Sequence, residues 1–287
     1  MQKFITSNFS YLLWFLLYFF IAWIILGATL TSFFIVLAIY VLSITVALSP
    51  IGEAILRLTE NCRGLATEQE KTYLIPIFEE VYDSARAANP NLNSDIQMYI
   101  MDAMYVNAFA IGRKTIAVTK GAIETFTAEE LKGVLGHEFG HMTYGHTKAL
   151  LLSTIGNFFF SIITWLLRVL LAVFEGIASA LASENIVALL FQLIAFVVRI
   201  AFNVCVFIFV NLGEIILAMN SRANEVQADE FAFKIGYGRE QISALYLLQK
   251  ISINAKVKLS DRLKASHPYL SDRIAHLEEL ENRMIPA

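Results

Sequence analysis

The sequence predicts a mostly α-helical integral membrane protein with four spanning helices and a cytoplasmic α+β part that carries a small β-sheet. Of its 287 residues 57% are hydrophobic and only 16% are charged, with a mean hydropathy of +0.59. A soluble domain of this size carries about a quarter charged residues, so much of the chain is suited to lipid. Uncharged runs long enough to cross a bilayer alternate with blocks of ordinary soluble composition.

The first apolar run covers residues 11–48 and is interrupted only by Gly27-Ala28-Thr29. A spanning helix needs about 20 apolar residues, so this run predicts two helices joined by a tight turn. A cleaved signal peptide is the alternative for its first half. It is disfavoured because the apolar core is too long and no small-residue cleavage site follows it cleanly. Residues 1–49 are therefore expected to form a transmembrane hairpin.

Residues 50–148 have the composition of a soluble domain. Helical periodicity covers residues 67–88, where Pro76 is expected to introduce a kink. Short β-type segments follow at 96–101, 106–111 and 115–118, with a hairpin turn at 112–114. Thr127 and Glu130 then have the spacing of a capping box, which predicts the start of another helix.

A second transmembrane hairpin is predicted at residues 149–219, with apolar runs at 149–174 and 186–219. Three ionisable residues interrupt these runs, and such residues are candidates for function. Arg168 and Glu214 lie near run ends, where side chains reach the interface, whereas Arg199 stays open. Residues 220–287 form the last soluble block.

The distribution of charge predicts the orientation of the chain in the membrane and bears on which partners it binds. Nearly all basic residues occur at Lys3, within 57–148 and from Arg222 onward, and the connections 27–31 and 175–185 contain none. The positive-inside rule therefore places both termini and the soluble blocks on the cytoplasmic side. A net charge of −3 and a pI near 6.0 give no reason to expect nucleic acid. Cys62 and Cys205 have no metal-ligand spacing and favour no disulfide.

The helix predicted after Thr127 contains His137-Glu138-Phe139-Gly140-His141, the HExxH pattern. Residues at i and i+4 share a helix face, so the two imidazoles can converge on one ion, with Glu138 beside them as a general base. Such a donor set suits Zn²⁺ and metal-assisted hydrolysis. An ordinary polar helix face is the alternative, and a third ligand has to come from elsewhere in the chain.

Residues 221–230 are expected to be helical, with Glu225 and Asp229 on one face. Glu225 suits the third ligand position. Asp229 suits a supporting position, where it accepts a ring N–H from a ligand histidine. A solvated acidic face is the alternative. His146 lies nine residues after His137, about half a turn off the ligand face, so a structural role is preferred for it and for His276.

The order of these motifs resembles that of the HtpX-type membrane zinc metallopeptidases, gluzincins related to the CAAX prenyl proteases. The resemblance covers nearly the whole chain: HEFGH, two spanning segments, then Glu225-Val226-Gln227-Ala228-Asp229. It extends to the NAFA segment at residues 107–110 and to Ser266-His267-Pro268 followed by Arg273. Tyr269 stands where the family has a second proline.

The resemblance implies a zincin-like domain with one Zn²⁺ per chain. His137, His141 and Glu225 would bind the ion, while Glu138 would act as base and then as acid. His267 would stabilise the oxyanion, and Arg273 would pair with Asp229. An edge strand would pair with substrate backbone through Asn107, Ala108, Phe109 and Ala110.

The implied function is zinc-dependent cleavage of unfolded or misassembled membrane proteins at the cytoplasmic side of the plasma (inner) membrane, a quality-control role. Polypeptides and the lipid bilayer are the implied partners, and the oligomeric state stays open. One alternative is a CAAX-protease-like or intramembrane processing peptidase. An intramembrane site is disfavoured because Glu129, Glu130 and Lys132 precede the motif closely. Another is a zinc transporter or non-proteolytic zinc-binding protein, although the apolar runs lack paired ligands and Glu138 is present.

Overall fold

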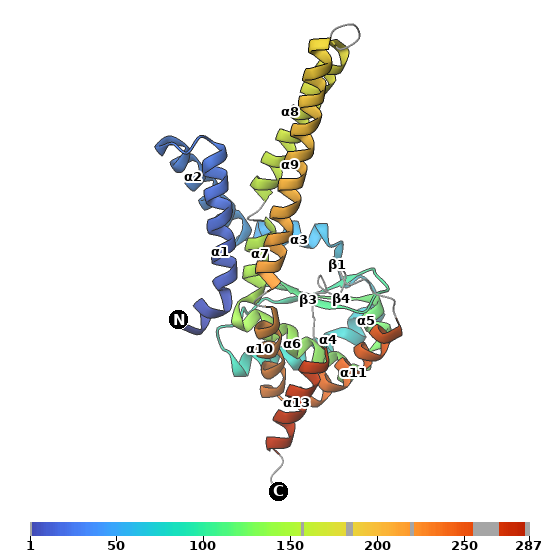
Figure 1. The fold of residues 1–287 in the computed structure, drawn as a ribbon. Helices are drawn as coiled ribbons and strands as arrows, with labels where there is room; N and C mark the ends of the chain where they lie inside the picture. Colours follow the sequence, from blue (N-terminus) through green and yellow to red (C-terminus); the bar gives the residue numbers. More distant parts are fainter. Residues whose placement is uncertain (1, 156–157, 182–185, 219–220, 255–269, 285–287) are drawn as a thin grey trace.

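The computed structural model describes residues 2–155, 158–181, 186–218, 221–254 and 270–284 (Figure 1). Most of these residues are helical, as the sequence predicts. The N-terminal helices are α1 (Gln2–Ile25), α2 (Leu30–Ala47) and α3 (Pro50–Thr59). The elements that follow are β1 (Cys62–Gly64), α4 (Glu68–Ala88), β2 (Gln97–Met101), β3 (Ala108–Ile111), β4 (Thr115–Thr119), α5 (Lys120–Thr125), α6 (Ala128–Tyr144), α7 (His146–Ile155), α8 (Phe158–Leu181), α9 (Ile186–Ala218), α10 (Ser221–Lys234), α11 (Gly238–Asn254) and α13 (Leu270–Met284).

The small sheet is mixed and has the strand order β1-β2-β4-β3. β2 and β4 are parallel, while β1 and β3 each pair antiparallel with their single neighbour in the described part of the chain. The predicted hairpin turn joins β3 to β4, where Gly112 adopts φ +60°, a conformation that favours glycine. The three predicted strands are confirmed, with starts shifted by up to two residues. β1 is an addition, and it has only three residues.

Helices cover both faces of the sheet. The main core lies between the sheet and helices α4 and α6, where Ile100, Ile116 and Val118 pack with Leu131 and Leu135. On the opposite face, Ile111 of β3 packs with Leu56 of α3 and Leu151 of α7. Figure 1 shows α3 and α7 on the side of the sheet that faces the long helices α8 and α9, with α4 and α6 on the other side.

Among the described residues, two helices are long and apolar enough to cross a membrane. They are α2, at Leu30–Ala47, and α9, at Leu189–Ile208, with mean hydropathies of 2.4 and 2.2. A shorter apolar stretch lies in α1 at Leu12–Ile24. The predicted third span divides into α7 and α8. α7 is held to the sheet, because Leu151 is buried there and the Thr147 hydroxyl donates to the Gly112 carbonyl at 2.6 Å.

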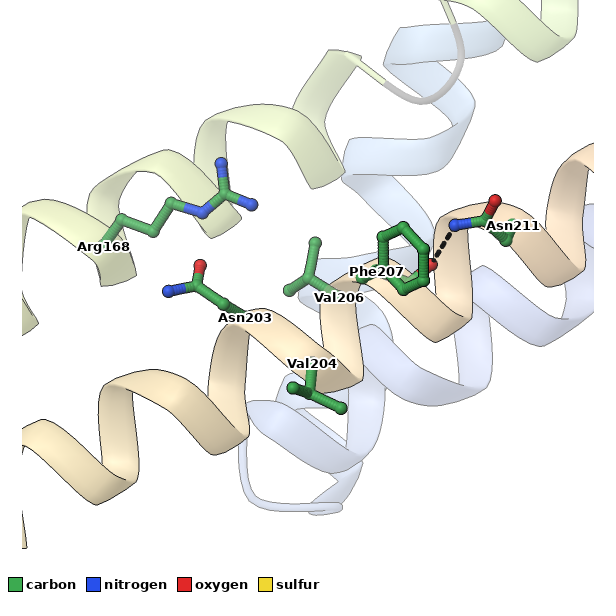
Figure 2. Close-up of a pocket in the computed structure, with 6 residues that line it drawn as sticks. All are labelled: Arg168, Asn203, Val204, Val206, Phe207 and Asn211. Carbon is green, nitrogen blue, oxygen red and sulfur yellow. Dashed lines mark hydrogen bonds between the residues drawn. The ribbon is translucent and has the colours of Figure 1, made fainter. Parts of the chain in front are cut away.

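Ionisable residues of α8 and α9 face each other. Arg199, left open by the sequence, pairs with Glu175 at 3.3 Å. Arg168 lies with Asn203 and Asn211 around an open pocket of about 530 Å³ between the two helices (Figure 2). The Glu214 side chain lies outside the described part of the structure.

Candidate metal centre

The first part of the site is α6, whose ends the sequence specifies. The Thr127 hydroxyl accepts from the Glu130 amide at 3.2 Å, and the Glu130 carboxylate accepts from the Thr127 amide at 2.9 Å. The predicted capping box is therefore confirmed. Gly145 ends the helix with φ +79°, a left-handed C-cap that glycine adopts without strain.

The second part is α10, which packs directly against α6. A Cβ built on Gly140 would lie only 2.7 Å from the Ala228 Cα atom. The two backbones therefore approach each other more closely than a side chain at position 140 allows. This close approach brings Glu225 and Asp229 of α10 beside His137 and His141 of α6, and all four side chains are largely or completely buried.

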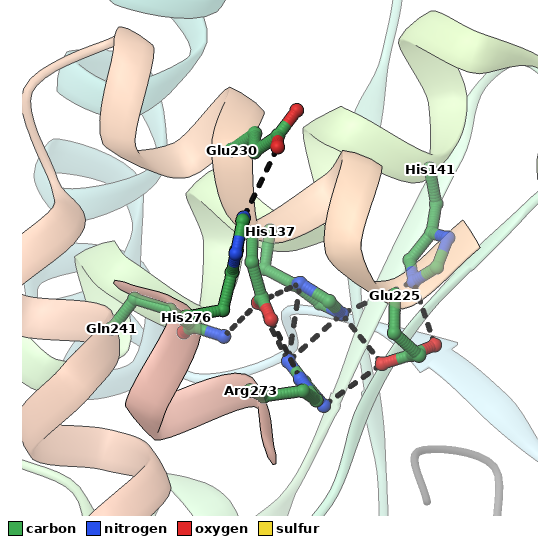
Figure 3. A network of polar contacts seen from close by, with 8 residues as sticks. His137, His141, Glu225, Glu230, Gln241, Arg273 and His276 are labelled. Atoms are coloured by element: carbon green, nitrogen blue, oxygen red, sulfur yellow. Dashed lines mark hydrogen bonds and ion pairs between the residues drawn. The ribbon is translucent and has the colours of Figure 1, made fainter. Parts of the chain in front are cut away.

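His137, His141 and Glu225 converge on one point (Figure 3). The two histidine Nε2 atoms lie 3.1 Å apart. Each also lies 3.4 Å from an oxygen of Glu225, Oε2 for His137 and Oε1 for His141. Ligands bonded at about 2.1 Å to one tetrahedral ion lie about 3.4 Å apart, so the three residues fit a metal ion of that kind.

Asp229 orients His137. Its Oδ1 lies 2.8 Å from His137 Nδ1, which leaves Nε2 directed at the cluster. Burial and the nearby Arg273 lower the pKa of His137, but Asp229 and Glu225 outweigh them and raise it to about 9. Without a metal, the imidazole is therefore expected to carry a proton on both ring nitrogens at neutral pH. A metal ion has to displace that proton when it binds.

Arg273 of α13 joins the two carboxylates of α10. Its Nε and Nη2 donate to Asp229 at 2.7 Å each, and its Nη1 lies 2.8 Å from Glu225 Oε2. The Gln241 side-chain amide also donates to Asp229, at 3.0 Å. Burial raises the pKa of Asp229, but Arg273 and His137 outweigh it and hold that pKa far below its usual range. Asp229 thus stays ionised inside the protein.

His146 contacts the Nδ1 atom of His141, as Asp229 contacts the Nδ1 atom of His137. The two Nδ1 atoms lie 3.0 Å apart, so one ring donates to the other. Burial lowers the pKa of His146 to about 4, so it is neutral at physiological pH. When the Nδ1–H group of His141 donates a hydrogen bond to His146 Nδ1, the lone pair of His141 Nε2 remains available for a metal.

The other predicted site residues have different positions. Glu138 is buried in α6, and its charge helps to raise the pKa of Arg273 against burial. Residues 108–110 belong to β3, and Asn107 precedes it, exchanging backbone and hydroxyl hydrogen bonds with Thr119. His267 lies outside the described residues. His276 contacts Glu230 at 3.1 Å and takes no part in the cluster.

Two contacts of the site, that of His146 with His141 and that of Gln241 with Asp229, were not predicted from sequence. The argument against His146 assumed one continuous helix from His137, but Gly145 ends α6 and His146 begins α7. The glycine before His146 was the available signal, because it marks a helix end. For Gln241 no spacing pointed to Asp229.

A mixed α/β unit with buried HExxH histidines and a glutamate from a later helix defines the class of a metallopeptidase. The chain belongs to peptidase family M48, whose family model matches residues 68–281. It is an HtpX-type metalloprotease associated with the membrane, so the resemblance and the enzyme class predicted from sequence are confirmed.

Among its relatives, the chain is 28% identical over 222 residues to "Protease HtpX homolog" of Bacillus licheniformis, covering 70% of this chain and 68% of the relative. It is 29% identical over 204 residues to "Protease HtpX" of Buchnera aphidicola, covering 63% and 66%. The chain thus spans about two thirds of these relatives. The crystal structure of S. mikatae Ste24p shares the fold at a TM-score of 0.50 and 18% identity, covering 92% of this chain and 61% of that one.

Proposed function

We propose that the chain is a zinc endopeptidase that cleaves unfolded or misassembled membrane proteins at the cytoplasmic face of the membrane. The observation that carries the proposal is the cluster of His137, His141 and Glu225: the two Nε2 atoms lie 3.1 Å apart, and each lies 3.4 Å from a different oxygen of Glu225. Two imidazoles and one carboxylate are the donor set of hydrolytic zinc sites. The general base such a site needs is Glu138, which the HExxH spacing puts on the same helix.

The residues have separate tasks in this proposal. His137, His141 and Glu225 would hold the zinc ion, which would supply Lewis acidity; in such sites the pKa of a water ligand falls to about 7. Glu138 accepts the proton of the attacking water and then delivers it to the departing amine nitrogen. Asp229 and His146 hold the two imidazoles in the tautomers that direct Nε2 to the cluster. His267 is proposed as an oxyanion donor.

The edge strand β3 is proposed to bind the substrate. In the described structure it pairs on one side only, with β4, so its other backbone edge can accept an extended chain. Backbone pairing recognises extended chain of any sequence, which suits unfolded proteins. The apolar stretches of α1, α2, α8 and α9 are proposed as four spans, with the site and both termini in the cytoplasm, because the basic residues favour that orientation.

Cleavage of an unfolded casein-like substrate by the purified full-length protein tests the proposal. We expect hydrolysis that a chelator stops and that added zinc restores. Glu138→Gln serves as the matched control, because it retains the ligands and lacks only the base. Equal hydrolysis with and without the chelator, or by Glu138→Gln, would refute the assignment.

A further inference from the structure

Helix α3 has an exposed apolar face. It begins three residues after the end of α2, with Ser49 as N-cap and Pro50 at the first position. Ile51, Ile55 and Leu58 are 64%, 42% and 75% exposed. Their spacing of i, i+4 and i+7 places them on one side of the helix, where they form an apolar stripe.

The opposite face of α3 carries its polar groups, and these bind the sheet. Glu53 is 5% exposed, and its carboxylate accepts from the Arg113 amide at 3.1 Å, the Lys114 amide at 3.0 Å and the Thr115 hydroxyl at 2.7 Å. Arg57 donates to the same hydroxyl at 2.9 Å. If α3 rotated to bury its apolar stripe, these hydrogen bonds would break, and the backbone amides of Arg113 and Lys114 would lose their acceptor.

α3 thus buries Leu56 and its polar groups against the rest of the protein and leaves a second apolar stripe exposed, whereas a surface helix of a water-soluble protein turns its apolar face inward. We propose that Ile51, Ile55 and Leu58 lie in the cytoplasmic leaflet of the bilayer, so that α3 is an interfacial helix. Its attachment to the apolar helix α2 supports a lipid occupant. In Figure 1 α3 runs across the direction of α8 and α9, on the side of the sheet that faces them.

The connection between β2 and β3 also exposes large apolar side chains. Met104 and Tyr105 are 66% and 55% exposed in the connection between β2 and β3. Tyrosine is common at the membrane interface, where its ring and hydroxyl meet different media.

The proposed contact of α3 with lipid fixes the distance between the metal centre and the membrane. Glu53 binds the turn between β3 and β4, so the edge of β3 cannot move away from the lipid independently of α3. This consequence rests on the proposed function: the preferred substrates are chain segments that leave the bilayer directly beside a span. A soluble unfolded chain has no such advantage.

Nitroxide labels test the lipid contact in full-length protein reconstituted into phosphatidylcholine–phosphatidylglycerol liposomes. Single cysteines at Leu58 and Ile55 are labelled after Cys62 and Cys205 are replaced by serine. Collision rates with oxygen and with a water-soluble nickel chelate are compared with those of Val41 in α2 and of Lys71 in α4. We expect positions 55 and 58 to favour oxygen, as Val41 does. Rates like those of Lys71 would overturn the proposal.

A second experiment tests the consequence for substrates. The variant with Ile51→Ser, Ile55→Ser and Leu58→Ser is compared with wild type on one unfolded segment, presented free or fused directly to a single span. We expect a severalfold loss on the fused substrate and an unchanged rate on the free one. The matched control replaces three exposed apolar residues elsewhere, Tyr73, Ile75 and Ile251, by serine.

The outcomes separate the two proposals. Equal rates of the α3 variant and the control on the fused substrate would refute the substrate preference. Wild type that cleaves neither substrate in the presence of zinc would refute the proposed function. In that case the nitroxide result alone still decides whether α3 contacts lipid.

Discussion

Replacing Arg273 by methionine should make the fold of the soluble part depend on the metal. Arg273 is 3% exposed and is the cation between Asp229 and Glu225. Removing one partner of a buried ion pair costs about 3–5 kcal/mol, because the other charge stays buried without compensation. Domains are stable by about 5–15 kcal/mol, so the metal-free variant should lose a large fraction of its stability. A bound divalent cation should restore part of it, because it compensates Glu225 directly.

The assay is denaturant unfolding of metal-free and zinc-loaded protein, followed by a probe on α13 outside the membrane-embedded helices. Arg273→Lys is the matched control: it keeps the charge but loses the two-point contact with Asp229. We expect the metal-free midpoint to fall most for Arg273→Met and less for Arg273→Lys. We also expect zinc to raise the midpoint of Arg273→Met more than that of wild type. A metal-free Arg273→Met protein with the wild-type midpoint would refute the reasoning.

Three further predictions concern the other parts of the site. Glu138→Gln should keep one metal ion per chain, while its turnover falls by about 10²- to 10⁴-fold, which is the usual contribution of a general base. Metal analysis and turnover measured on the same sample check this, and normal turnover would contradict it. Asp229→Asn should weaken metal affinity by about 10- to 100-fold, because His137 loses its charged partner. Chelator competition measures the affinity, and a wild-type value would show that Asp229 does not need to orient His137. Gly140→Ala should cost about 1–3 kcal/mol in unfolding experiments, because the new Cβ meets Ala228 at 2.7 Å, whereas Gly136→Ala, with neighbours at 3.4 Å, should cost less. Equal midpoints for the two alanine variants would mean that the helices separate freely.

Sequence reasoning succeeded where the signal is local. The start of α6 follows from the capping box, and the shared face of His137 and His141 follows from helix periodicity. The three predicted strands and the turn at Gly112 follow from short-range propensity and turn chemistry. The contact of Glu225 with these histidines could be proposed because HExxH requires a third ligand.

Contacts across long sequence separations could not be obtained in the same way. Pairing of β1 with β2 depends on tertiary context, since three residues carry no periodicity. For α3 the helical spacing of the apolar residues is visible in the sequence. Which face turns inward is decided by Glu53 and the amides of residues 113 and 114, sixty positions away. The contact of Arg273 with Glu225, in addition to Asp229, likewise needs the packing of α13.

A metal ion bound at this site would be coupled to the folding of the whole soluble part. Glu138, Glu225 and Asp229 are three buried carboxyl groups, and Arg273 is buried beside them. A divalent cation held by His137, His141 and Glu225 would add positive charge to this buried group of carboxyls. The ligands come from α6 and α10, which lie on opposite sides of α8 and α9 in the sequence. An ion at this point therefore joins two soluble blocks that the apolar helices separate, and its binding energy adds directly to the stability of their packing.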